Sequence, residues 1–384
     1  MTPTYDNGVV RLYQGDARDL SGVPDESVHC IVTSPPYWGL RDYGLEPSVW
    51  GGDDHEHEWE NETVATEIGK GNWAQGVNGR GELQPGGVDA KREPLRSASS
   101  RSCCPCGAWR GTLGLEPTID LYVEHMVEVF RKLWRVLRKD GTCWLNIGDS
   151  YASAWSTSRR NIIGNTSPAL AERVDRLSGC LKDKDLCMMP ARVALALQAD
   201  GWWVRSDVVW SKPNPMPESV TDRCTKAHEY IFLLSKSPRY YYDADAIKED
   251  LVYPNETRRP LGSKGAWQMD GRGQRDNGGG AEYEGYPDKR NKRSVWTVTT
   301  KPFKGAHFAT FPPDLIEPCV LAGCPEGGIV LDPFGGAGTA GMVADRLGRN
   351  AVLIELNAEY AEMAHARLYD DSPLFAQFTQ EETV

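Results

Sequence analysis

The sequence of 384 residues lacks several features that would assign it to a specialised class of protein. It has no apolar run approaching the roughly 20 residues of a membrane span, and its first residues, MTPTYDNG, do not resemble a signal peptide. It also lacks an excess of basic residues, since 43 Lys and Arg stand against 54 Asp and Glu, a net charge of −11. We find no internal repeat. These absences argue against a membrane protein and a uniformly basic one, and predict a cytoplasmic protein.

The remaining composition is typical of a globular protein with a substantial core. Hydrophobic residues make up 40% and charged residues 25% of the chain, which fits one domain with insertions or two domains. The ten cysteines are scattered and indicate reduced thiols, apart from one cluster considered below. Any contact with nucleic acid must come from a local basic patch.

A strand, a glycine-rich turn and a helix follow one another near the C-terminal end. Residues 328–331 are an apolar run, residues 340–347 have helical spacing, and the turn between them contains Gly335, Gly336 and Gly338. Such a unit lets a ligand approach bare backbone and meet the positive end of a helix. A second strand, 350–354, ends at Glu355, where a carboxylate can accept hydrogen bonds from a ribose. The unit predicts a nucleoside-containing ligand, although an ordinary tight turn can look the same.

The turn favours S-adenosylmethionine among such ligands. It lacks the lysine and Ser/Thr pair of a phosphate-binding loop. Asp332, at the end of the strand, would repel a pyrophosphate but suits a ligand with a sulfonium and an amino group.

A stiff loop follows the predicted strand 28–32, with the sequence Ser34-Pro35-Pro36-Tyr37. Two successive prolines end the strand's hydrogen-bond ladder and fix the backbone, so Ser34 and Tyr37 are held in set orientations. A structural proline stop is the alternative. It would not require a small polar residue before the prolines and an aromatic one after them.

The proline loop and the glycine turn together resemble the motif pair of the amino-group DNA methyltransferases, in the order of the permuted β group. Further segments that resemble family motifs are Gly15-Asp16, 137–149, 208–219, 227–236 and 308–315. The resemblance implies an α/β fold with a Rossmann-like, mostly parallel, doubly wound sheet, the class I methyltransferase fold. It implies S-adenosylmethionine as cofactor, double-stranded DNA as partner, and a catalytic loop of Ser34, Pro35, Pro36 and Tyr37. The residues implied to bind the cofactor are Asp16, Asp332, Pro333, Phe334, Gly335, Gly336, Gly338, Thr339, Glu355 and Asn357.

The chemistry of amino methylation explains these residue types. An exocyclic amino group is a poor nucleophile because its lone pair is delocalised into the ring. Ser34 Oγ and the Pro35 carbonyl could accept its two N–H bonds as charge develops, and Tyr37 could stack on the extruded base. No covalent intermediate is needed, and the surroundings of Cys319 do not resemble the Pro-Cys loop of C5-cytosine enzymes.

The serine of the loop also bears on which base is methylated. Serine in place of Asp or Asn resembles the N4-cytosine enzymes more than most N6-adenine enzymes, which are the alternative. An RNA amino-methyltransferase and an inactive DNA-binding homologue are more remote alternatives.

Residues 50–110 differ from the rest of the chain and are expected to be an insertion. Cys103 and Cys106 have the spacing of a zinc knuckle, and His55 and His57 could complete a tetrahedral structural zinc site. The resemblance implies Cys-x-His in the first half, so Cys104 is an alternative to His55. Unrelated thiols beside a solvated acidic and histidine run are the other interpretation. A zinc deaminase is rejected because Pro105 lies inside the cysteine pair.

A second unusual segment lies between 244 and 304. Residues 251–304 contain eleven Lys and Arg against six Asp and Glu, and the family's target-recognition region falls here. A solvated loop is the alternative. Another proline-rich loop, 212–215, follows a predicted strand. The resemblance implies that it borders the target base, and a structural proline turn is the alternative. The predicted DNA-binding residues are Lys212, Asn214, Arg258, Arg259, Arg272, Arg275, Arg290, Lys292 and Arg293.

These segments divide the chain into six parts. We predict the catalytic-loop half of the core in 1–49, the insertion in 50–110, further core in 111–243, the target-recognition region in 244–304, the cofactor-binding part in 305–372 and a tail in 373–384. The family implies a prokaryotic or phage-encoded protein and, as one of several roles, a companion restriction endonuclease. The sequence indicates neither the recognition site nor an oligomeric state.

Overall fold

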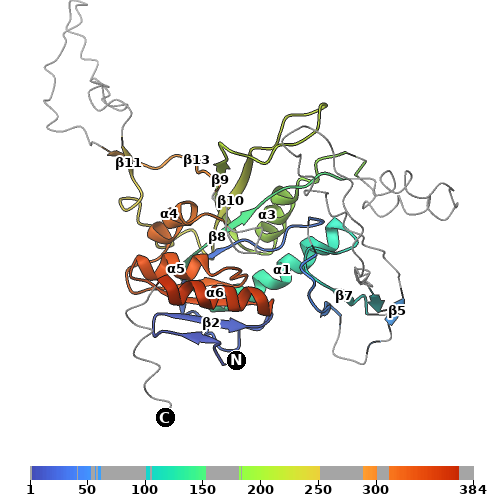
Figure 1. The fold of residues 1–384 in the computed structure, drawn as a ribbon, viewed down its shortest axis with the longest axis horizontal. Helices are drawn as coiled ribbons and strands as arrows, with labels where there is room; N and C mark the ends of the chain where they lie inside the picture. The colour runs from blue at the N-terminus through green and yellow to red at the C-terminus, as the bar shows by residue number, and fades with distance from the viewer. Residues whose placement is uncertain are drawn as a thin grey trace, which may run out of the picture.

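The computed structural model describes residues 2–40, 42–52, 57, 59–61, 101–103, 106–152, 181–182, 184–250, 289–300 and 311–371, of which 60, 61 and 101–103 are described by their backbone alone. Its centre is a nine-stranded sheet in the order β1-β2-β15-β14-β3-β8-β10-β9-β13 (Figure 1). The strands are β1 (Tyr5–Asp6), β2 (Val10–Gln14), β3 (Val28–Thr33), β8 (Leu137–Ile147), β9 (Trp203–Ser211), β10 (His228–Ser235), β13 (Val295–Thr297), β14 (Ile329–Asp332) and β15 (Asn350–Glu355).

The middle of the sheet is parallel. Strands β2, β15, β14, β3 and β8 all run in one direction, so their carboxyl ends lie at one edge. Strand β10 runs antiparallel to both β8 and β9, and β13 runs parallel to β9. The predicted Rossmann-like, mostly parallel fold is confirmed, with two antiparallel strands: β1 at one end of the sheet, and β10 between β8 and β9.

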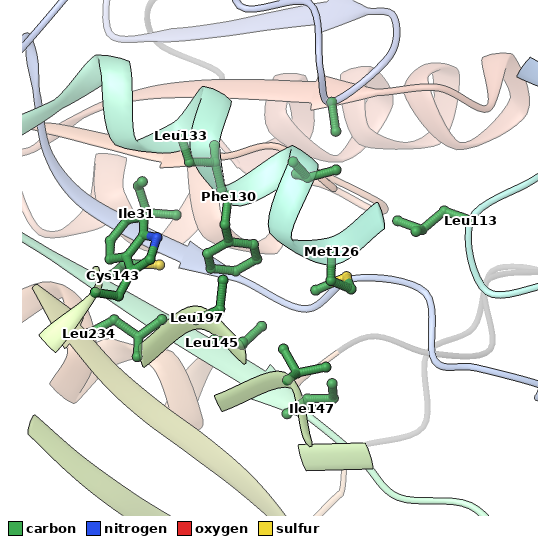
Figure 2. Packing of buried hydrophobic residues seen from close by; sticks show 14 of the residues in the cluster. Ile31, Leu113, Met126, Phe130, Leu133, Cys143, Leu145, Ile147, Leu197 and Leu234 are labelled. Carbon is green, nitrogen blue, oxygen red and sulfur yellow. The ribbon is translucent and has the colours of Figure 1, made fainter. Parts of the chain in front are cut away.

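Helices cover both faces of this sheet. Helices α1 (Ile119–Val136) and α3 (Met189–Ala199) belong to one buried cluster, and α4 (Pro313–Gly323), α5 (Thr339–Arg346) and α6 (Ala358–Asp371) belong to the other. Side chains alternate between the two clusters along β3: Ile31 packs with α1, whereas Cys30 and Val32 pack with α4. Figure 2 shows Phe130 and Leu133 of α1 in the same cluster as Ile31 and Cys143 of the sheet.

Helix α1 illustrates one difference from the prediction. It begins after Thr118, whose Oγ1 accepts a hydrogen bond from the Leu121 N–H, as an N-cap does. The sequence predicts that Lys139-Asp140-Gly141 ends the helix and that a strand starts at Thr142. This is wrong, because Leu137 is already extended and strand β8 starts there. A shift of the register between β3 and β8 accommodates the extra residues.

The described parts of the insertion form a small antiparallel sheet. Its order is β4-β7-β6-β5, with β4 (Ser48–Trp50), β5 (Trp59–Asn61), β6 (Arg101–Cys103) and β7 (Trp109–Gly111). Trp50 and Trp109 stack on the ring of His125 from α1, so this sheet is tied to the core. Among the helices that the structure describes, none has the length and apolar character of a membrane span.

Candidate active site

The two motifs of the sequence meet at the carboxyl edge of the sheet. Strand β3 ends at Thr33, directly before Ser34, and its neighbour β14 ends at Asp332. The hydroxyl of Thr33 donates a hydrogen bond of 2.7 Å to Asp332 Oδ1. The proline loop and the glycine turn are therefore side by side.

Asp332 lies in a low-dielectric setting. It is 1% exposed, and Oδ1 also accepts the Phe334 N–H at 3.1 Å. Burial raises the pKa of this carboxyl to about 7, against the lowering effect of the two hydrogen bonds, and the charge of Glu355 adds to the rise. A cation at this edge would favour the ionised form of Asp332.

The glycine turn is closed by Glu355, the last residue of β15. Its Oε2 accepts the Gly336 N–H at 2.7 Å, and its Oε1 accepts the Asn357 N–H at 2.8 Å. Each carboxylate oxygen can accept more than one hydrogen bond, so a ribose hydroxyl could still bind. Burial raises the pKa of Glu355. Gly335 is closely packed, because a Cβ there would lie 3.2 Å from Leu353 Cβ and 3.3 Å from the Ile354 carbonyl oxygen.

Three predicted cofactor residues have side chains already engaged within the protein. Asp16 accepts hydrogen bonds from Arg18 Nε at 3.0 Å and Arg18 Nη2 at 2.7 Å. Asn357 Oδ1 accepts the Glu359 N–H at the start of α6. The hydroxyl of Thr339 is buried and accepts Arg367 Nη1 at 2.7 Å. These hydrogen bonds hold the backbone around the site in place. Two further predicted cofactor residues are apolar: Pro333 is buried, and Phe334 packs against the buried cluster that contains α1.

The proline loop is held by α1 and by the segment that precedes this helix. The hydroxyl of Tyr122 donates to the Pro36 carbonyl at 2.8 Å, and the Gly39 N–H donates to the Gly114 carbonyl at 2.8 Å. Pro35 is buried, whereas Ser34 and Tyr37 are partly buried. Gly148 lies against the ring of Tyr37, since a Cβ at this position would be 2.6 Å from ring atom Cε2.

A polar network surrounds the Ser34 and Tyr37 hydroxyls. The Tyr37 hydroxyl donates to Glu229 Oε2 at 2.8 Å, and Asn146 Nδ2 donates to the Tyr37 hydroxyl at 2.8 Å. Asn146 Nδ2 also lies 3.3 Å from Ser34 Oγ, and Lys212 forms an ion pair with Glu229. Burial, followed by the charge of Glu229, holds the pKa of Tyr37 well above its ordinary value. Tyr37 is therefore a protonated donor at neutral pH.

Sequence reasoning missed Thr33, Tyr122, Asn146 and Glu229 as parts of this site. Glu229 was missed because the sequence does not show in which direction its strand runs in the sheet. Strand β10 is antiparallel, so its first residues pair with the last residues of β8 and β9 and lie at the functional edge. Thr33 and Asn146 stand at or near strand ends beside the motifs, a position that could have indicated them.

The predicted metal ligands are only partly described. His57 Nδ1 lies 3.5 Å from Cys106 Sγ, and the Ala108 N–H points to the same sulfur at 3.4 Å. Cys103 pairs through its backbone with Trp59. His55 and the side chain of Cys103 lie outside the described residues. Within the described residues, no group of three or more potential ligands comes together.

The predicted DNA-binding residues fall into two groups. Lys212 contacts Glu229 and the ring of Trp210, and Asn214 exchanges two hydrogen bonds of 3.0 Å with the backbone of Thr300. Arg290 and Arg293 both pair with Glu249 Oε1. Lys292 Nζ lies 5.1 Å from the ring centroid of Trp296. The others lie outside the described residues: Arg258, Arg259, Arg272 and Arg275.

A mostly parallel sheet with a proline loop and a glycine turn at its carboxyl edge defines a Rossmann-like enzyme of the class I methyltransferase fold. A family model of the N6 and N4 methyltransferases, described as DNA methylase, matches residues 28–366. The chain belongs to this DNA methylase family, and a DNA methyltransferase of this family takes its methyl group from S-adenosylmethionine.

Individual relatives cover nearly the whole chain. The type II methyltransferase M.Cfr9I of Citrobacter freundii is 39% identical over 358 residues, 93% of this chain and 87% of that protein. The type II methyltransferase M.SmaI of Serratia marcescens is 38% identical over 359 residues, 93% of this chain and 90% of that protein. The solved PvuII DNA methyltransferase, described as cytosine-N4-specific, has a TM-score of 0.53 at 15% identity, covers 99% of this chain and 96% of its own, and shows the same fold.

Proposed function

We propose that this protein is a site-specific DNA methyltransferase that transfers a methyl group from S-adenosylmethionine to the N4 amino group of cytosine in duplex DNA. The hydrogen bond between Thr33 and Asp332 carries the proposal, because it holds the proline loop beside the glycine turn. The serine of the loop favours cytosine. Adenine N6 is the alternative, since both amino groups require the same acceptors.

The residues present fit the cofactor. Asp332 and Glu355 supply carboxylates, and Gly335 and Gly336 let a ligand approach the backbone between them. When bound, S-adenosylmethionine supplies an electrophilic methyl group on a cationic sulfur. The buried Asp332 carboxylate favours a positive charge at this edge, and Glu355 is placed for a ribose hydroxyl.

The protein's own groups prepare the amino nitrogen. Ser34 Oγ and the Pro35 carbonyl accept its N–H bonds and stabilise the positive charge that develops there. The ring of Tyr37 offers a surface for the base, which has to leave the duplex to reach the site. Direct transfer needs alignment of the two reactants more than it needs a proton shuttle, and the stiff loop provides that alignment.

The product nucleoside tests this function. The purified protein is incubated with unmethylated duplex DNA and S-adenosylmethionine, and the digested DNA is analysed by mass spectrometry. We expect N4-methyldeoxycytidine, and a rate lowered roughly 10²- to 10³-fold in Ser34→Ala, by analogy with removing one group that stabilises a transition state. N6-methyldeoxyadenosine would establish the alternative, and methylation of RNA alone would exclude both.

DNA binding is proposed for the loop after β9 and for the basic segment 251–304. Lys212 and Asn214 lie on the loop after β9, next to Glu229 and Thr300. Arg258, Arg259, Arg272, Arg275, Arg290, Lys292 and Arg293 are proposed to contact phosphates or base edges. Together with the type II relatives, this supports a bacterial modification enzyme, acting in the cytoplasm beside a companion restriction endonuclease.

A structural zinc ion is proposed for the insertion. The approach of His57 Nδ1 to Cys106 Sγ supports it, and the Ala108 N–H pointing at this sulfur is a common companion of metal-bound thiolates. His55 and Cys103 complete the proposed set. Elemental analysis should find one zinc per chain, lost in Cys106→Ala and kept in Cys224→Ala, which removes an exposed cysteine elsewhere.

A further inference from the structure

Glu229 decides which groups donate and which accept in the hydrogen bonds around the proline loop. An ionised carboxylate only accepts hydrogen bonds, and Glu229 is approached by donors from three residues. The Tyr37 hydroxyl is 2.8 Å from Oε2, Asn146 Nδ2 is 3.1 Å from the same oxygen, and the Lys212 ammonium pairs with Oε1. The lysine also lies over the Trp210 ring, at 4.1 Å from its centroid. The ion pair sets the ammonium of Lys212 against the Glu229 carboxylate, and both side chains are 17% exposed.

The donor and acceptor roles of Tyr37 in turn determine those of Ser34. Because the Tyr37 hydrogen is committed to Glu229, the tyrosine oxygen acts as an acceptor. It accepts from Asn146 Nδ2 at 2.8 Å and from the Ser34 hydroxyl at 3.3 Å. The Ser34 hydrogen therefore points at Tyr37 and is not available to a substrate. Asn146 Nδ2 has two hydrogens for three acceptors, the Tyr37 oxygen at 2.8 Å, Glu229 Oε2 at 3.1 Å and Ser34 Oγ at 3.3 Å. It can therefore take up at most one lone pair of Ser34 Oγ, and at least one lone pair is left for a ligand.

Without the carboxylate, the chain of hydrogen bonds could reverse. Tyr37 could then donate to Ser34, and Ser34 could turn its own hydrogen toward the substrate. A donor at that point would face the N–H bonds of an amino group, which need an acceptor. We propose that Glu229, held by Lys212, is a positioning residue that fixes the Tyr37 and Ser34 hydroxyls so that Ser34 Oγ presents a lone pair to the amino group of the target base. This rests on the proposed amino methylation and applies to cytosine and adenine alike.

The test separates this role from a structural one. Glu229→Gln keeps the shape of the side chain, but the amide can also donate hydrogen bonds. Tyr37 is then no longer required to be the donor, and the hydroxyls of Tyr37 and Ser34 lose their fixed orientation. We expect kcat to fall roughly 10- to 100-fold, the rate equivalent of one charge-assisted hydrogen bond, with the KM values for DNA and S-adenosylmethionine and the melting temperature unchanged. Asp200→Asn, which removes a carboxylate paired with Arg131 away from the site, should keep the wild-type kcat.

A double-mutant cycle with Tyr37→Phe completes the test. Tyr37→Phe keeps the ring for stacking but breaks the link between Glu229 and Ser34, so it should lower kcat by itself. Glu229→Gln should then have little further effect on kcat in the Tyr37→Phe background. A wild-type kcat in either single variant, or equal fold-losses for Glu229→Gln with and without Tyr37, would overturn the inference. If Glu229→Gln does not fold, Tyr37→Phe alone still decides. Failure of the wild-type protein to methylate DNA would instead overturn the proposed function.

Discussion

Thr33 and Asp332 are 299 positions apart in the chain, and a hydrogen bond of 2.7 Å joins their side chains. This bond ties the residue directly before the proline loop to the last residue of β14, which precedes the glycine turn. Both residues are buried, at 0% and 1% exposure, so water cannot replace the bond when it is lost. The proline loop and the glycine turn thus share a rigid link.

Replacing Thr33 tests this link. Thr33→Val keeps the shape but leaves Asp332 without one of its donors, and should lower the free energy of unfolding by about 1–3 kcal/mol. It should also weaken the binding of S-adenosylmethionine, because the turn loses its tie to the loop. Urea unfolding and calorimetric titration measure the two effects. Thr33→Ser keeps the hydroxyl and should be closer to wild type in both; equal losses in the two variants would contradict the role of the hydrogen bond.

The raised pKa of Asp332 predicts a pH dependence of stability. The folded protein holds this proton up to a pH of about 7, whereas the unfolded chain releases it near the ordinary value of 3.8. Between these values the folded state binds more protons, so this carboxyl contributes stability that is lost as the pH rises toward 7. Asp332→Asn removes this titration. The free energy of unfolding of the variant minus that of wild type should therefore increase with pH, and the total increase is at most roughly 1.4 kcal/mol for each unit by which the pKa of Asp332 is raised.

The measurement is urea unfolding of both proteins, without cofactor, at a series of pH values from 4 to 8. Glu355 also has a raised pKa and remains in both proteins, so the difference reports Asp332 together with its electrostatic coupling to Glu355. A difference between the variants that does not change with pH would show that Asp332 is ionised throughout.

Much of this arrangement could be predicted from the sequence, for identifiable reasons. Strands β3, β14 and β15 are short apolar runs that stop at Ser34, Asp332 and Glu355, and parallel strands bring such ends to one edge. Their bounds in the structure differ from the predicted ones by at most one residue at each end. The start of β8 was mispredicted because Lys139-Asp140-Gly141 is typical of a turn, and pairing with β3 overrides that preference.

The contacts of Glu229 could not be predicted in the same way. It follows His228 at the start of an apolar strand, which gives no sign of the strand's direction. Only the antiparallel pairing of β10 with β8 and β9 brings Glu229 to Tyr37 and Lys212. Local spacing does not carry this information, because pairing partners far apart in the chain decide it.

Gly148 should be required for the position of the Tyr37 ring. A methyl group there would lie 2.6 Å from ring atom Cε2, closer than packed atoms approach. Gly148→Ala should therefore displace Tyr37, lower kcat and weaken its hydrogen bond to Glu229. Methylation rates measured with saturating DNA and S-adenosylmethionine check this. Gly22→Ala is the control, because a Cβ at Gly22 would meet only the Tyr13 ring at 3.8 Å; the same loss of rate in both variants would contradict the prediction.

The small sheet of the insertion should influence the catalytic loop through His125 and Glu116. His125 Nδ1 lies 3.0 Å from Glu116 Oε1, both side chains are buried, and burial raises the pKa of Glu116 while the histidine opposes the rise. Glu116 Oε2 also accepts the Gly114 N–H, and its carbonyl accepts Trp38 Nε1, next to the loop. His125→Ala leaves this carboxylate buried without its partner and removes a ring packed between Trp50 and Trp109. We expect a loss of about 3–5 kcal/mol in the free energy of unfolding.

Adding Glu116→Gln should separate the two parts of that loss. The amide carries no charge, so Glu116→Gln with His125→Ala should be more stable than His125→Ala alone, by the cost of the unpaired carboxylate. The loss of stability that remains in the double variant reflects the missing ring contacts of His125 with Trp50 and Trp109. This loss should be accompanied by faster hydrogen exchange in both the insertion sheet and residues 34–40. If exchange increases only in the insertion sheet, the histidine stabilises that sheet without holding the catalytic loop, and the coupling between them does not exist.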